Sequence, residues 1–232
     1  MTYCVAWKYQ GTAFIVADSA ATKSVLPSLP RSSVGEAQQF MYNYSVEESL
    51  LKIVTINNNI VVAYSGDVLT ATSIIDFIKN SLGLHGNVGE LIKSISLSLG
   101  PFDKEWAVSL IIANILGNDV NLVKWDSNNP NVFCGGNDVF QIGNLQTYHS
   151  SLTHSLLSLL VSGKLPIERM LPIVTAIIQS YGVHDNMMSH HIGGMIYGIS
   201  LSKHDGVRWQ EDIKYVLYDP EFNKYWCHYL LV

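Results

Sequence analysis

Residues 1–19 read MTYCVAWKYQGTAFIVADS, and this stretch decides the fold of the chain. Apolar and β-branched residues fill Tyr3–Tyr9 and Thr12–Ala17, which is typical of two neighbouring strands. Gln10-Gly11 between them predicts a tight turn. We therefore expect a β-hairpin that returns Asp18 to the neighbourhood of the first residues, where its carboxylate can orient an ammonium group.

Thr2 stands directly behind Met1 at the head of this hairpin. Removal of Met1 would leave Thr2 with a hydroxyl and a free α-amine on the same residue. An α-amine has a pKa of about 8, so it can accept the hydroxyl proton directly or through one water. Thr2 is therefore a candidate nucleophile that carries its own base. A retained Met1 would turn that amine into an amide, which is not basic.

A second hairpin is predicted between Lys52 and Gly66. Lys52–Ile56 and Ile60–Ser65 are rich in β-branched residues, and the intervening Asn57-Asn58-Asn59 tolerates the left-handed backbone of a tight turn. The first two hairpins together supply one sheet's worth of strands.

Helices are expected next, and the second half of the chain repeats this order. Asp67 can N-cap a helix that ends near Gly83, and Val88–Leu99 has the spacing of a second helix. The later expected elements are strands at Ala107–Asn114, Val120–Trp125 and Val139–Ile142, helices at Leu145–Val161 and Pro166–Ser180, and closing strands at Gly194–Leu201, Tyr215–Tyr218 and Tyr225–Leu231. Strands grouped before helices favour two packed antiparallel sheets flanked by helices.

These blocks resemble the N-terminal-nucleophile (Ntn) hydrolases, and in particular the proteasome β-type subunits. That family opens with Thr, a hydrophobic strand, a Gly-containing turn, a second hydrophobic strand and Asp-Ser, as in Thr2 through Asp18-Ser19. Its lysine strand, hairpin and return strand ending in Ser-Gly are similar to Lys52 through Gly66. The start Met-Thr-Tyr-Cys-Val-Ala without a propeptide looks most like the bacterial ancestral β-subunit (Anbu-type) homologues.

The resemblance implies an α+β fold, the four-layer αββα sandwich of two antiparallel sheets that Ntn hydrolases share. It extends over nearly the whole chain, so we expect one domain spanning residues 1–232. The stretch at about 23–46 has a loop composition and is longer than in typical β-subunits. We expect an inserted loop there that serves as a flap beside the cleft or as a contact to a neighbouring subunit, with simple disorder as the alternative.

The resemblance also implies a threonine peptidase. Thr2 would attack the peptide carbonyl, its α-amine would shuttle the proton, and Lys52 would keep the site electropositive. Asp18 would hydrogen-bond Lys52, and the Gly66 N–H would face the developing oxyanion. Structural alternatives stay open for each: a solvated lysine at a strand edge, a turn-forming aspartate, and a glycine required for steric reasons.

Other positions match the family less closely. The family's serine before the third helix is replaced here by Asn144, which can still donate and accept hydrogen bonds near the α-amine. Its second aspartate and serine, three residues apart, look like Asp185 and Ser189, which are four apart. The resemblance further implies a substrate side-chain pocket without charged residues, which favours apolar or small side chains. The residues of that pocket are Ala21, Leu50, Val54, Tyr64 and Val68.

Charge, hydropathy and cysteine content exclude several kinds of partner and of site. The net charge is −5 with a pI near 5.9, so no basic surface is indicated and nucleic acid is not an expected partner. No basic leader with an apolar run and no stretch of about eighteen apolar residues is present in the sequence, so we expect a cytoplasmic protein without a membrane partner. Three widely spaced cysteines do not predict a disulfide or zinc framework.

A metal site and a cofactor are not expected. His184, Asp185, His190 and His191 are the only suggestive cluster, but adjacent histidines on a strand point to opposite faces. Cys4 is expected to be a small buried residue rather than a nucleophile.

The expected partners are peptide or unfolded-protein substrates and further copies of this chain. The charged fraction is only 14%, which is low for a monomer and consistent with subunit contacts or with a surface rich in Asn and Ser. We expect a ring or helical homo-oligomer; the sequence does not identify an unfoldase partner. A catalytically inactive scaffold subunit and a small-molecule amidase of the Ntn class are the alternatives.

Overall fold

The fold is described from a computed structural model of the chain. The described residues are 3–24, 38–41, 44–47, 50–81, 107–129, 134–135, 139–143, 147–184, 193–211 and 213–216. Within these, only the backbone is described for residues 21–24, 38–41, 44–47, 134–135, 147–148, 181–184 and 215–216.

The first large sheet is built around the hairpin at the start of the chain. Its six strands are β1 (Tyr3–Tyr9), β2 (Thr12–Asp18), β11 (Phe140–Gly143), β12 (Gly194–Ser202), β13 (Gly206–Trp209) and β14 (Lys214–Val216). They run in the order β11-β1-β2-β12-β13, with β14 also paired to β12, and all pairs are antiparallel. The closing strand β12 therefore lies directly beside β2, with Ile196 opposite Asp18.

The second large sheet holds the expected hairpin at Lys52–Gly66 and the expected strands at Ala107–Asn114 and Val120–Trp125, so the first two hairpins lie in different sheets and not in one. Its strands are β6 (Ile53–Asn57), β7 (Ile60–Gly66), β8 (Val108–Leu116), β9 (Asp119–Asp126) and β10 (Cys134–Gly135), in the order β10-β9-β8-β7-β6. A third, small sheet consists of β3 (Ala21–Ser24), β5 (Tyr44–Glu47) and β4 (Gln38–Met41). All of these pairs are also antiparallel.

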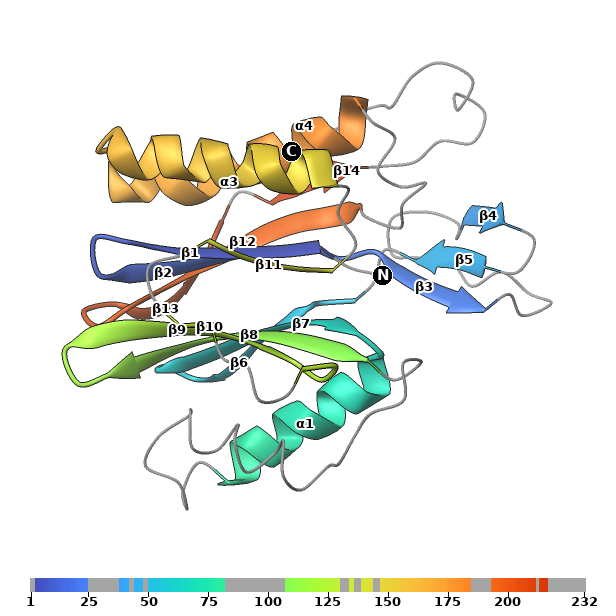
Figure 1. The fold of residues 1–232 in the computed structure, drawn as a ribbon, viewed down its shortest axis with the longest axis horizontal. Coiled ribbons are helices and arrows are strands. Elements are labelled where there is room, and N and C mark those ends of the chain that lie inside the picture. Colours follow the sequence, from blue (N-terminus) through green and yellow to red (C-terminus); the bar gives the residue numbers. More distant parts are fainter. Residues whose placement is uncertain are drawn as a thin grey trace.

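Helices cover the outer faces of the two large sheets, which lie one above the other (Figure 1). The described helices are α1 (Val68–Ser81), the 3-10 turn η2 (Ile167–Arg169), α3 (Thr147–Ser162) and α4 (Met170–His184). Helices α3 and α4 lie against the six-stranded sheet, and α1 lies against the five-stranded sheet (Figure 1). The described part of the chain is thus a mixed α+β sandwich of two antiparallel sheets.

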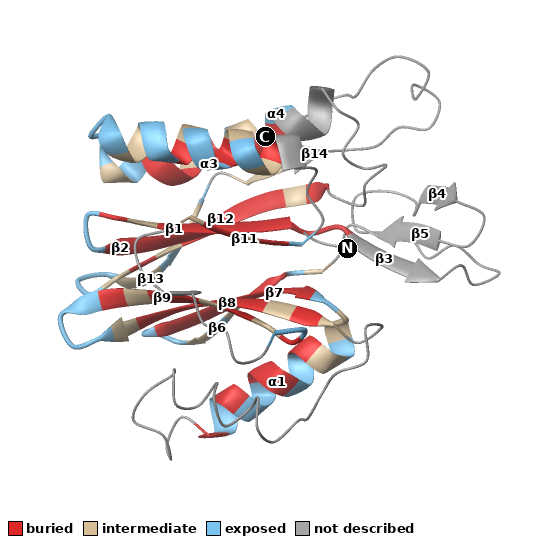
Figure 2. Cartoon of the chain, in the orientation of Figure 1, coloured by how far each residue is buried: buried red, intermediate tan, exposed pale blue. Residues whose placement is uncertain are grey.

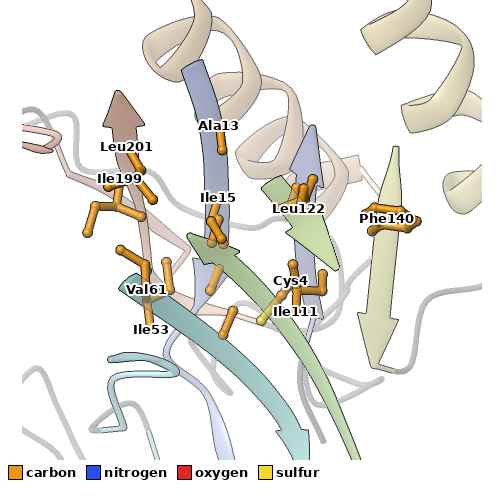
Figure 3. Packing of buried hydrophobic residues seen from close by; sticks show 14 of the residues in the cluster. Cys4, Ala13, Ile15, Ile53, Val61, Ile111, Leu122, Phe140, Ile199 and Leu201 are labelled. Carbon is orange, nitrogen blue, oxygen red and sulfur yellow. The ribbon is translucent and has the colours of Figure 1, made fainter. Parts of the chain in front are cut away.

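Buried apolar residues form three clusters, one in each space between layers (Figure 2). On β1, Tyr3, Val5 and Trp7 pack under the helices, whereas Cys4 and Ala6 face the other sheet. Successive side chains of a strand point to opposite faces, so a strand between two packed layers is apolar on both. Figure 3 shows the cluster between the two sheets, which excludes water from the space where they meet.

Most expected elements in the described residues are present, with ends shifted by a few residues. Strand β1 has the expected bounds, and Asp67 caps α1 through a hydrogen bond of 2.7 Å from Thr70 N–H to its carboxylate. Strand β13 was not expected. Residues 217–232 and Val88–Leu99, where a second helix is expected, lie outside the described residues.

The sequence predicts a loop over residues 23–46, but the structure has short strands in part of this stretch. Strand β4 lies within this stretch, and β3 and β5 overlap its two ends. The runs of β4 and β5 are only four residues each, too short to be recognised from a periodic pattern. Pairing with β3, which adjoins β2, completes their sheet.

Candidate functional site

A buried ion pair joins the two large sheets near the end of β2. The Lys52 Nζ lies 2.7 Å from Asp18 Oδ1, and the two side chains are 1% and 0% exposed. Asp18 is the last residue of β2, and Lys52 directly precedes β6. The structure therefore brings together two residues that the sequence analysis had paired, and Lys52 is not a solvated residue at a strand edge.

The Asp18 carboxylate also accepts two main-chain hydrogen bonds. The Tyr3 N–H donates to Oδ1 at 3.0 Å and the Gly193 N–H donates to Oδ2 at 3.0 Å. Together with Lys52, both carboxylate oxygens have donors, as a buried charge requires. Asp18 is thus more than a turn-forming aspartate, because it ties the start of β1 and the residue before β12 to Lys52.

Such a pair is a poor device for stability alone. Lysine is almost never fully buried unless it is paired with an opposite charge. Moving each charge of such a pair out of water costs on the order of several kcal/mol. A hydrophobic pair of similar volume would often be as stable or more so. A buried, hydrogen-bonded Lys–Asp pair is therefore a candidate for a functional role.

Ser19 fixes the backbone that follows Asp18. Its Oγ accepts the Met195 N–H at 2.8 Å, and its carbonyl accepts the Leu50 N–H at 3.1 Å. The Ser19 and Ala20 N–H groups both donate to Gly193 O, at 3.2 and 3.1 Å. The Asp-Ser pair of the sequence motif therefore joins the segment ahead of β12 to the segment that carries Lys52.

Two tyrosines that no sequence pattern connects with Lys52 hold its main chain. The Lys52 N–H donates to the Tyr197 hydroxyl, and the Tyr64 hydroxyl donates to Leu51 O at 3.2 Å. Burial raises the pKa of Tyr64 to about 12 and also raises the pKa of Tyr197, so both hydroxyls stay protonated at neutral pH. Tyr197 comes from the other sheet, and no local pattern points to it.

Cys4 lies next to this group but is not a nucleophile. Its thiol is buried and donates to Tyr64 O at 3.7 Å. Burial raises the pKa of the Cys4 thiol strongly, although the Lys52 charge lowers it. A thiol that keeps its proton at neutral pH is unreactive.

Gly66 occupies the expected strand-to-helix position, and a steric reason for glycine is present there. Its φ is +105°, and a Cβ at this position would lie 2.0 Å from Ala107 O. Asp67 follows and caps α1, so the Gly66 N–H lies just ahead of the positive end of that helix. The positive φ and the close approach of Ala107 O explain why residue 66 is a glycine. The role of the Gly66 N–H in binding an oxyanion stays a prediction.

The predicted pocket residues differ in their exposure. Leu50, Val54 and Val68 are half-buried, whereas Tyr64 is 4% exposed with its hydroxyl bonded to Leu51. Ala21 lies in β3, of which only the backbone is described.

The other predicted site residues lie outside the described residues. They are Thr2, Asn144, Asp185 and Ser189, and the histidines His190 and His191 lie there too. Among the residues that are described, no three His, Cys, Asp or Glu side chains gather as a metal site would need. No described helix combines the length and apolar character needed to cross a membrane.

A cavity of about 460 Å³ in the described residues is not part of this site. It lies between η2, the start of α4 and the β12–β13 hairpin, and it includes Thr12 and Phe14. Thr12 and Asp18 are at opposite ends of β2, about 20 Å apart at the rise of an extended strand. None of the predicted site residues lines this cavity.

Comparisons with known proteins add no family to this description. No model of a protein family matches the chain, and a search of curated proteins found no match. The candidate site therefore depends on the geometry of the residues themselves.

Proposed function

We propose that this protein is a threonine-type N-terminal-nucleophile peptidase with the Ntn-hydrolase fold, similar to a self-compartmentalising proteasome β-subunit. One observation carries the proposal. Asp18 Oδ1 binds both the Lys52 ammonium and the Tyr3 N–H, and Tyr3 N is covalently bonded to the carbonyl carbon of Thr2. The Lys52–Asp18 pair therefore binds the main chain of the residue that directly follows Thr2, the proposed nucleophile.

In the proposed reaction, Thr2 carries both nucleophile and base once Met1 is removed. The α-amine accepts the hydroxyl proton while Oγ attacks the substrate carbonyl carbon, and the Lys52 charge stabilises the developing alkoxide. The tetrahedral oxyanion accepts the Gly66 N–H. Collapse of the tetrahedral intermediate breaks the C–N bond of the substrate, and the protonated α-amine of Thr2 donates its proton to the leaving amine. Water then hydrolyses the acyl ester on Thr2, with the α-amine of Thr2 again as the base.

The substrate proposal follows from the residues around this site. Leu50, Val54 and Val68 are uncharged and half-buried, and Leu51 beside them is 52% exposed. A pocket of this kind favours apolar or small side chains of a peptide or unfolded protein. Asn144, Asp185 and Ser189 are assigned to the same network through the family resemblance alone. A homo-oligomeric assembly and a cytoplasmic location are part of the same proposal.

The test is covalent labelling of Thr2. Intact mass should show a chain that lacks Met1, and a peptide epoxyketone should add one equivalent to it. Thr2→Ala should abolish both labelling and peptide hydrolysis, whereas Thr72→Ala, at an exposed threonine of α1, should change neither. Undiminished labelling and turnover by Thr2→Ala would refute the proposal.

A further inference from the structure

The main chain on either side of the Leu51–Lys52 peptide bond is held by two tyrosine hydroxyls. Tyr197 accepts the Lys52 N–H, and Tyr64 donates to Leu51 O at 3.2 Å. Tyr197 is 3% exposed and Tyr64 is 4% exposed, so water does not compete for these groups. Each tyrosine also packs in an apolar cluster, which restricts the ring and therefore the hydroxyl.

Strand pairing explains why this point needs a side-chain partner. The Tyr64 N–H donates to Lys52 O at 3.0 Å, which continues the β6–β7 ladder by one residue. The Tyr64 carbonyl accepts the Cys4 thiol instead of the Lys52 N–H. The Lys52 N–H therefore leaves the ladder and bonds across the interface to Tyr197 on the other large sheet.

Tyr197 is connected to Asp18 as well as to Lys52. On β12, Ile196 lies opposite Asp18 and Tyr197 lies opposite Ala17. These contacts form a closed loop. Strand pairing places Asp18 opposite Ile196, the neighbour of Tyr197. The Tyr197 hydroxyl binds the Lys52 N–H, and the Lys52 ammonium pairs with Asp18. Lysine has a flexible four-carbon stem, so its ammonium is only as well placed as its main chain.

We propose that Tyr197 and Tyr64 form a clamp on residues 51–52 that positions the Lys52 ammonium against Asp18 for catalysis. The two tyrosines are positioning residues, not catalytic ones, and their catalytic part rests on the proposed function. Neither hydroxyl is assigned to the substrate. Tyr64 is thereby reassigned from the lining of the substrate pocket to the support of Lys52.

The test removes each hydroxyl and keeps the ring. Tyr197→Phe and Tyr64→Phe are compared with Tyr9→Phe, a matched control that removes the hydroxyl donating to Leu165 O at 3.0 Å, far along β1 from the site. Thermal unfolding is measured first, and all rates are taken where each variant is fully folded.

The first readout does not need enzymatic activity. Surface amines are acetylated with a succinimidyl ester, and each lysine is followed by mass spectrometry. Lys52 should react about tenfold faster in the two clamp variants than in the wild type, whereas Lys79 of α1 serves as the internal standard. Unchanged Lys52 reactivity in both variants would overturn the clamp, whether or not the protein is a peptidase.

The second readout is kinetic. Both clamp variants should lower kcat by about 10- to 100-fold with KM within about twofold, because a misplaced charge weakens the transition state more than substrate binding. Normal kcat in variants with exposed Lys52 would overturn the catalytic part. A wild type that neither hydrolyses peptides nor labels at Thr2 would refute the proposed function, and the acetylation result would still decide the clamp.

A third measurement needs no variant. The Lys52 amide should exchange with solvent far more slowly than an exposed amide, because its acceptor is a buried hydroxyl from another sheet. Exchange of the Lys52 amide at the rate of an open loop would overturn the clamp.

Discussion

Lys52 and Asp18 form an ion pair of 2.7 Å at the junction of the two sheets, with side chains 1% and 0% exposed. Lys8 and Asp119 form a contrasting pair of 3.1 Å in which the Asp119 side chain is 71% exposed. The hydrogen bond from Lys8 lowers the pKa of Asp119, yet water screens an exposed pair and limits its contribution. The two pairs therefore predict different responses to loss of one charge.

Lys52→Met should lose peptidase activity by orders of magnitude, because the proposed alkoxide loses its neighbouring charge. It should also lower the free energy of unfolding by about 3–5 kcal/mol, since Asp18 is left as a buried charge without its partner. Lys8→Met is the matched control and should cost at most about 1 kcal/mol. Urea titration and peptide hydrolysis measure both effects; near-normal kcat and stability in Lys52→Met would contradict the prediction.

Gly66→Ala should destabilise the fold more than a comparable substitution in open space. At Gly66 the φ is +105° and the added Cβ would meet Ala107 O at 2.0 Å, whereas at Gly117 the φ is +63° and nothing lies within 4 Å. Gly117→Ala should cost about 1–2 kcal/mol, from the left-handed backbone alone. Gly66→Ala should exceed it by about 2 kcal/mol or more, because a main-chain atom cannot rotate away. Equal costs in urea titration would rule out the steric requirement.

Alkaline pH should weaken the fold through the two buried tyrosines. Unfolded tyrosines ionise at about pH 10, whereas burial raises the pKa of folded Tyr64 to about 12 and also raises the pKa of folded Tyr197. Above about pH 10 the unfolded chain binds fewer protons than the folded chain, so the free energy of unfolding falls as pH rises. This contribution is fully present below that pH.

The measurement is urea unfolding at a series of pH values from neutral to about pH 11. Tyr64→Phe should show a shallower decline above about pH 10 than the wild type, because one buried hydroxyl is gone. Parallel curves for the two proteins would show that Tyr64 does not contribute to alkaline unfolding.

Assembly is expected because large apolar side chains remain exposed on the outer helices. Leu69 on α1 is 74% exposed and Leu159 on α3 is 66% exposed. We expect a homo-oligomer of about six or more chains, built by repeating one contact into a ring or a helical turn. Light scattering coupled to size-exclusion chromatography measures the mass, and Leu69→Glu or Leu159→Glu should reduce it. A stable monomer at micromolar concentration would favour a small-molecule amidase.

Local pattern alone was enough to predict most strands of the two large sheets and the start of α1, but not the short strands β10 and β13. The bounds of β1 and the capping of α1 by Asp67 depend on neighbouring residues, through side-chain alternation and a hydrogen bond across three positions. The pairing of Asp18 with Lys52 was also predicted, through the family resemblance, and the structure confirms their contact.

The proposed clamp on Lys52 and the proposed reassignment of Tyr64 depend on how the two sheets pack. Lys52 and Tyr197 are 145 positions apart in the chain, and their hydrogen bond exists because β12 lies beside β2 and faces β6 across a dry interface. The burial that keeps Tyr64 protonated, and the carbonyl that excludes a side chain at Gly66, arise in the same way. Sequence periodicity predicts which face of a strand is apolar. The distant residues that contact that face are determined only by the packing of the sheets and helices against one another.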